Sequence, residues 1–146
     1  MGFFDALTDL FTSAKPRVFI SYDHSEDRRY RDLLCAWNAN SAFDFAFERC
    51  SPITAINSKE ARVIKGELTK MLKKAKYLLV IVGEKTHMSR WVRWEIRRAK
   101  KEDINLKLVV VKLNKSYATP YGLLNEGASF AHSFTLEAIT RAIKKA

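Results

Sequence analysis

Cysteine is scarce in this chain, and long hydrophobic runs are absent. Only Cys35 and Cys50 occur among the 146 residues, which is too few for a disulfide framework. No secretory signal is in view, so we expect a cytoplasmic protein whose two thiols are free in a reducing compartment. The longest apolar run, residues 77–82, is far shorter than the roughly 20 residues of a membrane span. Neither a disulfide-stapled secreted module nor a membrane protein is therefore expected.

Glycine is scarce as well, with five residues, and none follows the first strand-like segment at 17–22. A loop that cradles phosphate needs glycines there, and dinucleotide and flavin loops share this need. Residues 23–27 are instead polar and mostly acidic. A receiver domain would require an aspartate after the segment at 77–82, where Gly83 and Glu84 stand. The three histidines have neither a nucleophile partner nor metal-ligand spacing, so no triad and no metal site is predicted.

Acidic residues are outnumbered, with 16 against 26 lysines and arginines, which gives a net charge of +10. Such a balance suits a polyanionic partner: a nucleic acid, an anionic lipid or a phosphate-bearing small molecule. The alternative is that these cations are solvated on surface helices, because they are spread along the chain and not gathered in one tail. No aromatic-rich strand of the RNA-reading type is present, so a basic nucleic-acid-binding α/β domain stays an alternative only.

Hydrophobic periodicity predicts one α/β domain at 15–146, preceded by an amphipathic helix at 1–14. That first helix has an acidic polar side, opposite to the usual membrane-surface pattern, so self-packing or contact with another copy is expected. Strand-like and helix-like segments then alternate along the chain. Strands are predicted at 17–22, 43–47, 77–82, 106–113 and near 128–132, and helices around 30–37, after an Asn57 cap, at 89–101 and at 135–145. This order predicts an open, mostly parallel sheet of four or five strands with helices on both faces, a three-layer α/β fold.

Two segments at the ends of predicted strands together resemble the TIR domain family. RVFISY at 17–22, followed by an acidic loop, is similar to the first box of the family, and SRWVRWE at 89–95 is similar to its Ser-x-Trp-Cys-x-x-Glu helix start. With VGEKT at 82–86 and FDF at 43–45, the chain resembles more specifically the TIR-like proteins of the Thoeris antiphage system. The resemblance implies a flavodoxin-like, TIR-like three-layer fold. It departs from the family at Val92, where many members have cysteine, and at 48–57, which is no recognisable TIR loop.

The resemblance also implies an activity: an NAD glycohydrolase or ADP-ribosyl cyclase that responds to a phage-derived trigger. NAD is then the substrate, no further cofactor and no metal are required, and a cyclic ADP-ribose product activates a separate effector. The resemblance makes Glu95 the catalytic residue, and the predicted substrate-binding residues are Ser21, Tyr22, Asp23, Ser25 and Trp91. Such chemistry suits one carboxylate, because nicotinamide leaves NAD without a general acid and only the positive charge on the ribose needs stabilising.

Two alternatives to this reading of the motifs remain open at this stage. Glu95 lies four residues after Trp91, so the two share a helical face, but the same spacing permits a surface ion pair of Glu95 with Arg97 or Arg98. The chain is alternatively a non-enzymatic TIR module that signals by assembly. A homo-oligomer is compatible with either function, since TIR-like enzymes often need a neighbouring copy to complete a site. Ser89 is predicted as a helix cap.

Overall fold

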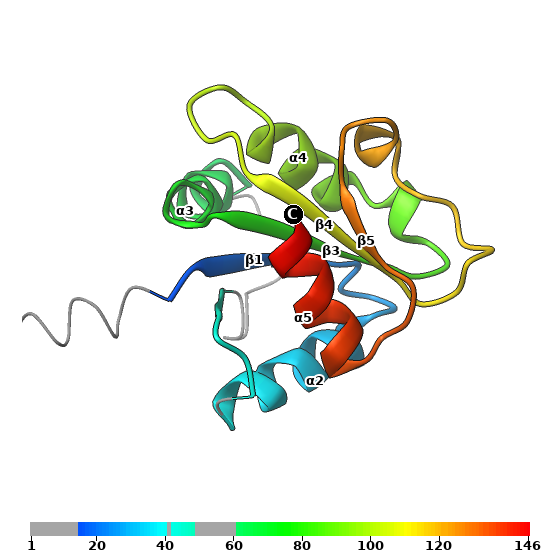
Figure 1. Cartoon of the computed structure of the whole chain (residues 1–146). Helices are drawn as coiled ribbons and strands as arrows, with labels where there is room; N and C mark the ends of the chain where they lie inside the picture. The colour runs from blue at the N-terminus through cyan, green and yellow to red at the C-terminus, as the bar shows by residue number, and fades with distance from the viewer. Residues whose placement is uncertain (1–14, 41, 49–60) are drawn as a thin grey trace, which may run out of the picture.

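The centre of the molecule is a parallel β-sheet of five strands, in the order β2-β1-β3-β4-β5 (Figure 1). This computed structural model describes residues 15–40, 42–48 and 61–146. The strands are β1 (Arg17–Ser21), β2 (Ala46–Glu48), β3 (Tyr77–Val82), β4 (Lys107–Lys112) and β5 (Ser129–Ala131). All four neighbouring pairs run parallel. The prediction of a mostly parallel sheet is confirmed, and the strand order is the flavodoxin-like one.

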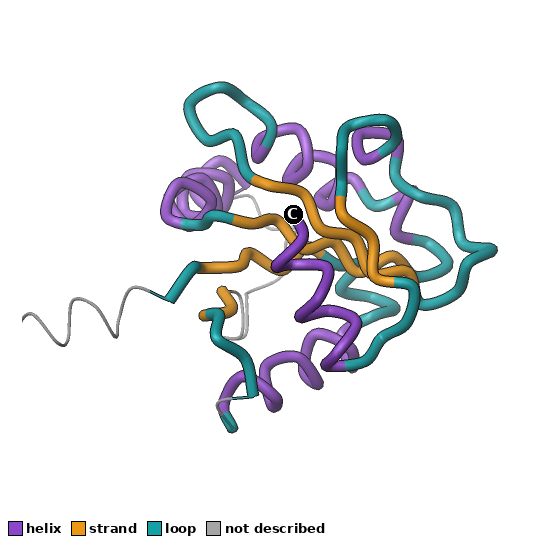
Figure 2. Tube along the Cα trace, in the orientation of Figure 1, coloured by secondary structure: helices purple, strands orange, loops and turns teal. Residues whose placement is uncertain are grey.

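Helices cover both faces of the sheet and complete three layers (Figures 1 and 2). One face carries α2 (Arg28–Ala39) and α5 (Leu136–Lys145), and the other carries α3 (Ala61–Lys74) and α4 (Arg90–Ala99). Two short 3-10 helices, η1 (Thr86–Met88) and η2 (Tyr121–Leu123), lie in the connections on either side of β4. The three-layer α/β fold is therefore as predicted.

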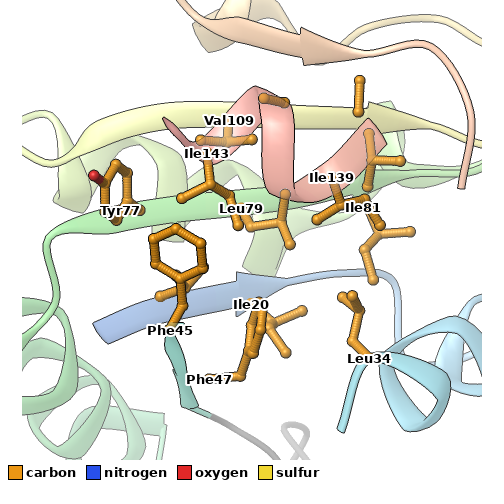
Figure 3. Close-up of a cluster of buried hydrophobic side chains, with 14 of the residues drawn as sticks. Ile20, Leu34, Phe45, Phe47, Tyr77, Leu79, Ile81, Val109, Ile139 and Ile143 are labelled. Carbon is orange, nitrogen blue, oxygen red and sulfur yellow. The ribbon is translucent and has the colours of Figure 1, made fainter. Parts of the chain in front are cut away.

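Side-chain alternation along the strands divides the apolar core into two halves. In β1, Val18 and Ile20 point to the α2 and α5 side, whereas Phe19 points to the α3 and α4 side. Figure 3 shows the first of these clusters, where Ile139 and Ile143 of α5 lie over the sheet. All six residues of β3 are buried, as expected for a central strand that is covered on both faces. At the carboxyl end of β1, this alternation turns Ser21 toward the face that α3 and α4 cover.

The second strand differs from its prediction. A strand was expected at 43–47, but β2 spans only Ala46–Glu48 and pairs with β1 alone. Phe43 and Phe45 are buried ahead of the strand, where their rings pack 4.8 Å from Phe47 and 6.1 Å from Tyr77, respectively. The alternating pattern thus reflects aromatic packing into the core, and backbone pairing begins only as it ends. The other predicted strands match within one or two residues at each end.

Two predicted helix starts lie where the sequence placed them. Ser89 precedes α4, and its hydroxyl accepts a hydrogen bond from the Val92 amide at 3.3 Å. Thr135 caps α5 in the same way, through the Ala138 amide at 3.2 Å. The predicted helix at 1–14, the Asn57 cap and the loop at 49–57 lie outside the described residues.

The expectation of two free thiols is wrong for Cys35, which is disulfide-bonded. The only other cysteine of the sequence, Cys50, lies outside the described residues. A count of two cysteines cannot reveal such a bond, because the proximity of Cys35 to its partner depends on how the chain folds. In the described ranges, no helix combines the length and the apolarity needed to cross a membrane.

Candidate active site

Two of the predicted site residues meet at the carboxyl end of β1. Ser21, the last residue of β1, donates a hydrogen bond from its hydroxyl to Oε1 of Glu95 on α4, at 2.8 Å. Both side chains are buried, and Glu95 is only 1% exposed. Glu95 is therefore not on the surface, and Arg98, one of the two surface partners considered for it, pairs with Asp103. The structure thus joins the predicted catalytic carboxylate to the first predicted substrate-binding residue.

The local sequence of α4 explains how a carboxylate comes to lie there. Its buried residues are Val92, Glu95, Ile96 and Ala99, which recur at the spacing of one helical face. Three of these are apolar and pack on the sheet, whereas Glu95 occupies an equivalent position with a carboxyl group. Glutamate is seldom buried unless a partner satisfies it, and buried carboxylates concentrate at functional sites. Its place within an apolar stripe therefore marks Glu95 as a functional candidate.

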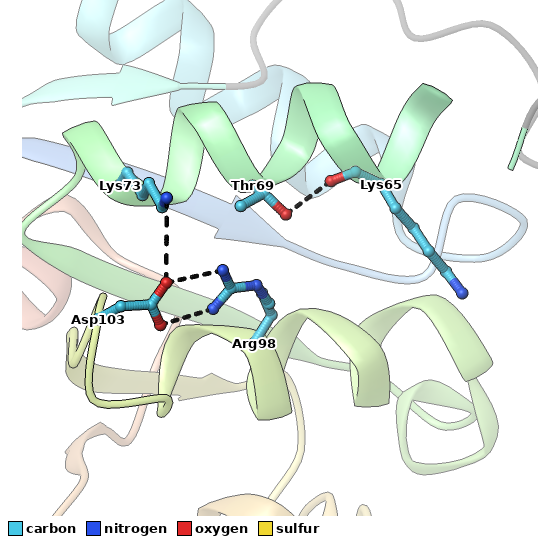
Figure 4. A network of polar contacts seen from close by, with 5 residues as sticks. All are labelled: Lys65, Thr69, Lys73, Arg98 and Asp103. Carbon is cyan, nitrogen blue, oxygen red and sulfur yellow. Dashed lines mark hydrogen bonds and ion pairs between the residues drawn. The ribbon is translucent and has the colours of Figure 1, made fainter. Parts of the chain in front are cut away.

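Trp91 lies one turn before Glu95, between α4 and α3. Its ring is 5.9 Å from that of Trp94 in an edge-on arrangement. Lys65 of α3 places its ammonium nitrogen 6.0 Å from the Trp91 ring centre and 5.8 Å from that of Trp94. Figure 4 shows Lys65 reaching from α3 toward the amino-terminal half of α4. Trp91 is partly buried against the core, so its ring is held in place while one part stays accessible.

The opposite ends of α3 and α4 are joined by an ion-pair network, which Figure 4 also shows. Asp103 accepts two hydrogen bonds from the Arg98 guanidinium, each 2.9 Å long, and lies 4.0 Å from the Lys73 nitrogen. The hydrogen bonds from Arg98 lower the pKa of the Asp103 carboxyl. The network connects the ends of the two helices. Because it is exposed to solvent, its contribution to stability is small.

Tyr22 points away from Glu95. It lies 2% exposed in the core on the α2 and α5 side, because successive residues of an extended chain alternate between faces. Its ring centre is 4.4 Å from that of His24, and its hydroxyl is 3.3 Å from His24 Nδ1. The side chain of Tyr22 thus packs on the face of the sheet opposite to α4, and its part in binding substrate stays a prediction.

Asp23 and Ser25 shape the loop that follows β1. Oδ1 of Asp23 accepts hydrogen bonds from the backbone amide of Ser25 at 3.0 Å and from its hydroxyl at 2.7 Å. This is an Asx turn, in which an aspartate side chain replaces a backbone carbonyl. The two residues contact each other, and their predicted contact with substrate stays a prediction.

Sequence reasoning missed a second buried polar pair near this site. Thr86 of η1 is fully buried, and its hydroxyl lies 3.2 Å from Oδ2 of Asp27, which is 5% exposed. Burial raises the pKa of the Asp27 carboxyl, and the hydrogen bond from Thr86 offsets part of that rise. In the sequence, Asp27 has the position of an ordinary helix cap, and nothing in the pattern links it to a threonine 59 residues later.

The described residues offer no group of three histidine, cysteine or carboxylate side chains placed to hold a metal ion. Three cavities, of about 250, 320 and 410 Å³, lie along β5, the carboxyl-terminal part of α5 and the loop before β4. None of these three is lined by Ser21 or Glu95. They are therefore separate from the pair at the end of β1.

Comparisons with known proteins give one family match and one likeness in fold. The family model described as Thoeris protein ThsB, TIR-like domain, matches residues 19–118, a span that contains both buried polar pairs. The chain is also similar in fold to a crystal structure of a putative pilus assembly-related protein from Burkholderia pseudomallei, with 12% identity and a TM-score of 0.51. That likeness covers 90% of this chain and 88% of the other, and concerns the fold alone. No curated protein sequence matches the chain.

Proposed function

Because the chain belongs to the family of the Thoeris protein ThsB, TIR-like domain, we propose that it is an NAD-consuming enzyme of antiphage defence. The proposed reaction cleaves the bond between nicotinamide and ribose. The observation that carries this proposal is Glu95, a buried carboxylate in an otherwise apolar helix face, held by Ser21 at the carboxyl end of a parallel strand. Ligands of open parallel sheets bind at this edge.

The proposed reaction requires the protein to stabilise positive charge on the ribose. The carbon–nitrogen bond breaks with its electron pair moving to the pyridinium nitrogen, so nicotinamide leaves as a neutral molecule. Positive charge then develops on the ribose, and the Glu95 carboxylate stabilises it, most strongly where water is excluded. The Ser21 hydroxyl donates a hydrogen bond to Oε1 of this carboxyl group at 2.8 Å. We expect the bound ribose to replace this hydrogen bond.

The surroundings of the pair suit a dinucleotide. Trp91 offers a flat ring for stacking against a base. Exposed cations, among them Lys65, Arg90 and Arg93, lie at the facing ends of α3 and α4, where they favour the two phosphates of NAD. Attack on the ribose by a group of the adenosine, in place of water, yields a cyclic ADP-ribose. We propose that such a product is the signal to a separate effector.

The test compares nicotinamide release from NAD by the wild type and by Glu95→Gln, with and without lysate from phage-infected cells. Glutamine keeps the shape and an oxygen that can accept from Ser21, but it replaces the carboxyl group by a neutral amide. Glu102→Gln, at an exposed glutamate after α4, is the matched control and should release nicotinamide like the wild type.

Two results would contradict the proposal in different ways. Full activity of Glu95→Gln would remove the assignment of Glu95. No nicotinamide release by the wild type, even with infected lysate, would remove the enzyme and leave the non-enzymatic assembly module. Mass spectrometry of the released nucleotide distinguishes linear from cyclic ADP-ribose.

A further inference from the structure

Two loops leave neighbouring strands at the edge of the sheet where the candidate site lies. The β1–α2 loop (22–27) follows Ser21, and the β3–α4 loop (83–89) leads into the helix that carries Glu95. Strands β1 and β3 are paired from Val18 and Tyr77 onward, so their loops start side by side. The two loops are held together by the buried pair of Asp27 and Thr86.

The Thr86 hydroxyl is the centre of this contact. It accepts a hydrogen bond from the Gly83 amide at 2.8 Å. It shares its single hydrogen between Oδ2 of Asp27, at 3.2 Å, and the carbonyl of Ile81, at 3.3 Å. One side chain therefore ties together the end of β3, the turn that follows it and the neighbouring loop.

Asp27 makes this contact in place of a local one. It stands at the cap position of α2, where an aspartate ordinarily accepts from an amide of the first turn, yet its side chain makes no such bond. Its carboxyl group is instead buried against the other loop, at an energetic cost that its raised pKa reflects. Departures of this kind from local rules are expected where function constrains the chain.

Gly83 is adapted to the same contact. A Cβ atom built on Gly83 would lie 2.6 Å from Cγ of Asp27, so the carboxyl group occupies the space of the missing side chain. An exposed ion pair joins the same two loops further out, with the Lys85 nitrogen 3.3 Å from Oε1 of Glu26. Being exposed, that pair contributes little and serves as a natural control.

A short backbone path connects the contact to Glu95. The carbonyl of Thr86 accepts from the amide of Ser89 at 3.0 Å, and Ser89 caps α4. Glu95 follows six residues later, within the same continuous helix. A shift of Thr86 therefore moves the start of α4, and with it the carboxylate relative to Ser21.

We propose that Asp27 and Thr86 are positioning residues, which fix the separation of the two loops and so set Glu95 against Ser21 at the end of β1 for cleavage of NAD. This inference rests on the proposed function. Neither residue touches the substrate in this proposal, and both act through the placement of other groups. Displacements of about 1 Å at sites remote from the chemistry are enough to lower turnover about 100-fold.

The kinetic test compares Thr86→Val, which keeps the shape but removes the hydroxyl, with Thr86→Ser, which restores it. We expect Thr86→Val to lower kcat per folded molecule at least about tenfold, with a smaller change in KM, because a misplaced carboxylate impairs the chemical step more than binding. Thr86→Ser should recover most of the loss. Lys85→Met, which breaks only the exposed ion pair, should stay within about twofold of the wild type. Circular dichroism and thermal unfolding give the folded fraction of each variant.

Hydrogen exchange tests the contact without any assay of NAD. In Thr86→Val we expect faster amide exchange in the β1–α2 loop, which carries no substitution, and the wild-type rate in Thr86→Ser. Wild-type exchange and wild-type kcat in Thr86→Val would together overturn the proposal, as would a lower melting temperature with unchanged kcat per folded molecule. If no protein releases nicotinamide, the proposed function fails and the catalytic role of this pair fails with it. The exchange data then still decide whether Asp27 and Thr86 hold the loops together.

Discussion

Replacing Gly83 with alanine should destabilise the protein strongly, although alanine is normally the better residue. The new Cβ would lie 2.6 Å from Cγ of Asp27, whereas carbon atoms pack at about 3.5–4.0 Å, so the carboxyl group must retreat by roughly 1 Å. Its hydrogen bond with Thr86 is already 3.2 Å long and would break. The unsatisfied buried carboxyl costs about 1–3 kcal/mol, and the overpacking costs about 1–3 kcal/mol. Alanine also lowers the conformational entropy of the unfolded chain, which stabilises the folded state by about 0.4–1 kcal/mol.

The net expectation is a loss of about 1–5 kcal/mol in the free energy of unfolding, measured by urea titration. In a domain of this size that corresponds to a fall in Tm of roughly 3–15 °C. Gly66→Ala is the control, because nothing lies within 4 Å of a Cβ added there, on α3. That variant should be more stable than the wild type, by up to about 1 kcal/mol.

A double-mutant cycle tests the stated cause. If Asp27 is the obstacle, Gly83→Ala should cost less than about 1 kcal/mol in a background that already carries Asp27→Ala, since the space is then vacant. An unchanged cost in that background would refute the reasoning, and so would a wild-type urea midpoint for Gly83→Ala alone. Either result would mean that the two loops adjust freely around the new methyl group.

Three further outcomes follow from single groups. Ser89→Ala should lower the free energy of unfolding by about 1 kcal/mol in urea, because the Val92 amide loses its cap. Asp103→Asn should destabilise the protein at neutral pH, and the difference from the wild type should shrink as the pH falls below 3.8, because Arg98 lowers the pKa of Asp103 in the folded state only. For Asp27→Asn the pH dependence should be opposite, because burial raises the pKa of Asp27 in the folded state. The stability of the wild type relative to the variant should fall as the pH rises from 3.8 through that raised pKa. Urea titrations at several pH values measure both differences.

Much of the fold was predictable because its signals are local. The apolar run of β3 and the periodic face of α4 are set by neighbours in the sequence. The cap of α4 is equally local, because the Ser89 hydroxyl accepts from the amide of Val92, three residues later. Alternation of strands and helices then leaves few arrangements other than a parallel sheet. Glu95 was singled out as a candidate because it stands in the segment 89–95, which resembles the TIR helix start, and its catalytic role stays a prediction.

The rest depends on tertiary structure. The edge strand β2 is only three residues long, and the aromatic residues before it follow a strand pattern while packing outside the ladder. The face to which Tyr22 points depends on the register of β1, because a shift of one residue would turn each side chain to the opposite face of the sheet. The contact of Asp27 with Thr86 joins residues that no sequence period connects, and the disulfide of Cys35 depends equally on long-range packing.

The buried polar side chains are concentrated in one part of the molecule. Among the described residues, the buried polar or charged side chains are Ser21, Asp27, Arg31, Thr86 and Glu95. Four of these five form two hydrogen-bonded pairs, and both pairs lie at the carboxyl ends of β1 and β3. Apolar residues would fill the same space at lower cost, so stability alone does not account for this concentration. A sheet edge that keeps two such pairs, one carrying a carboxylate and one fixing the loops around it, has the organisation expected of a preorganised site.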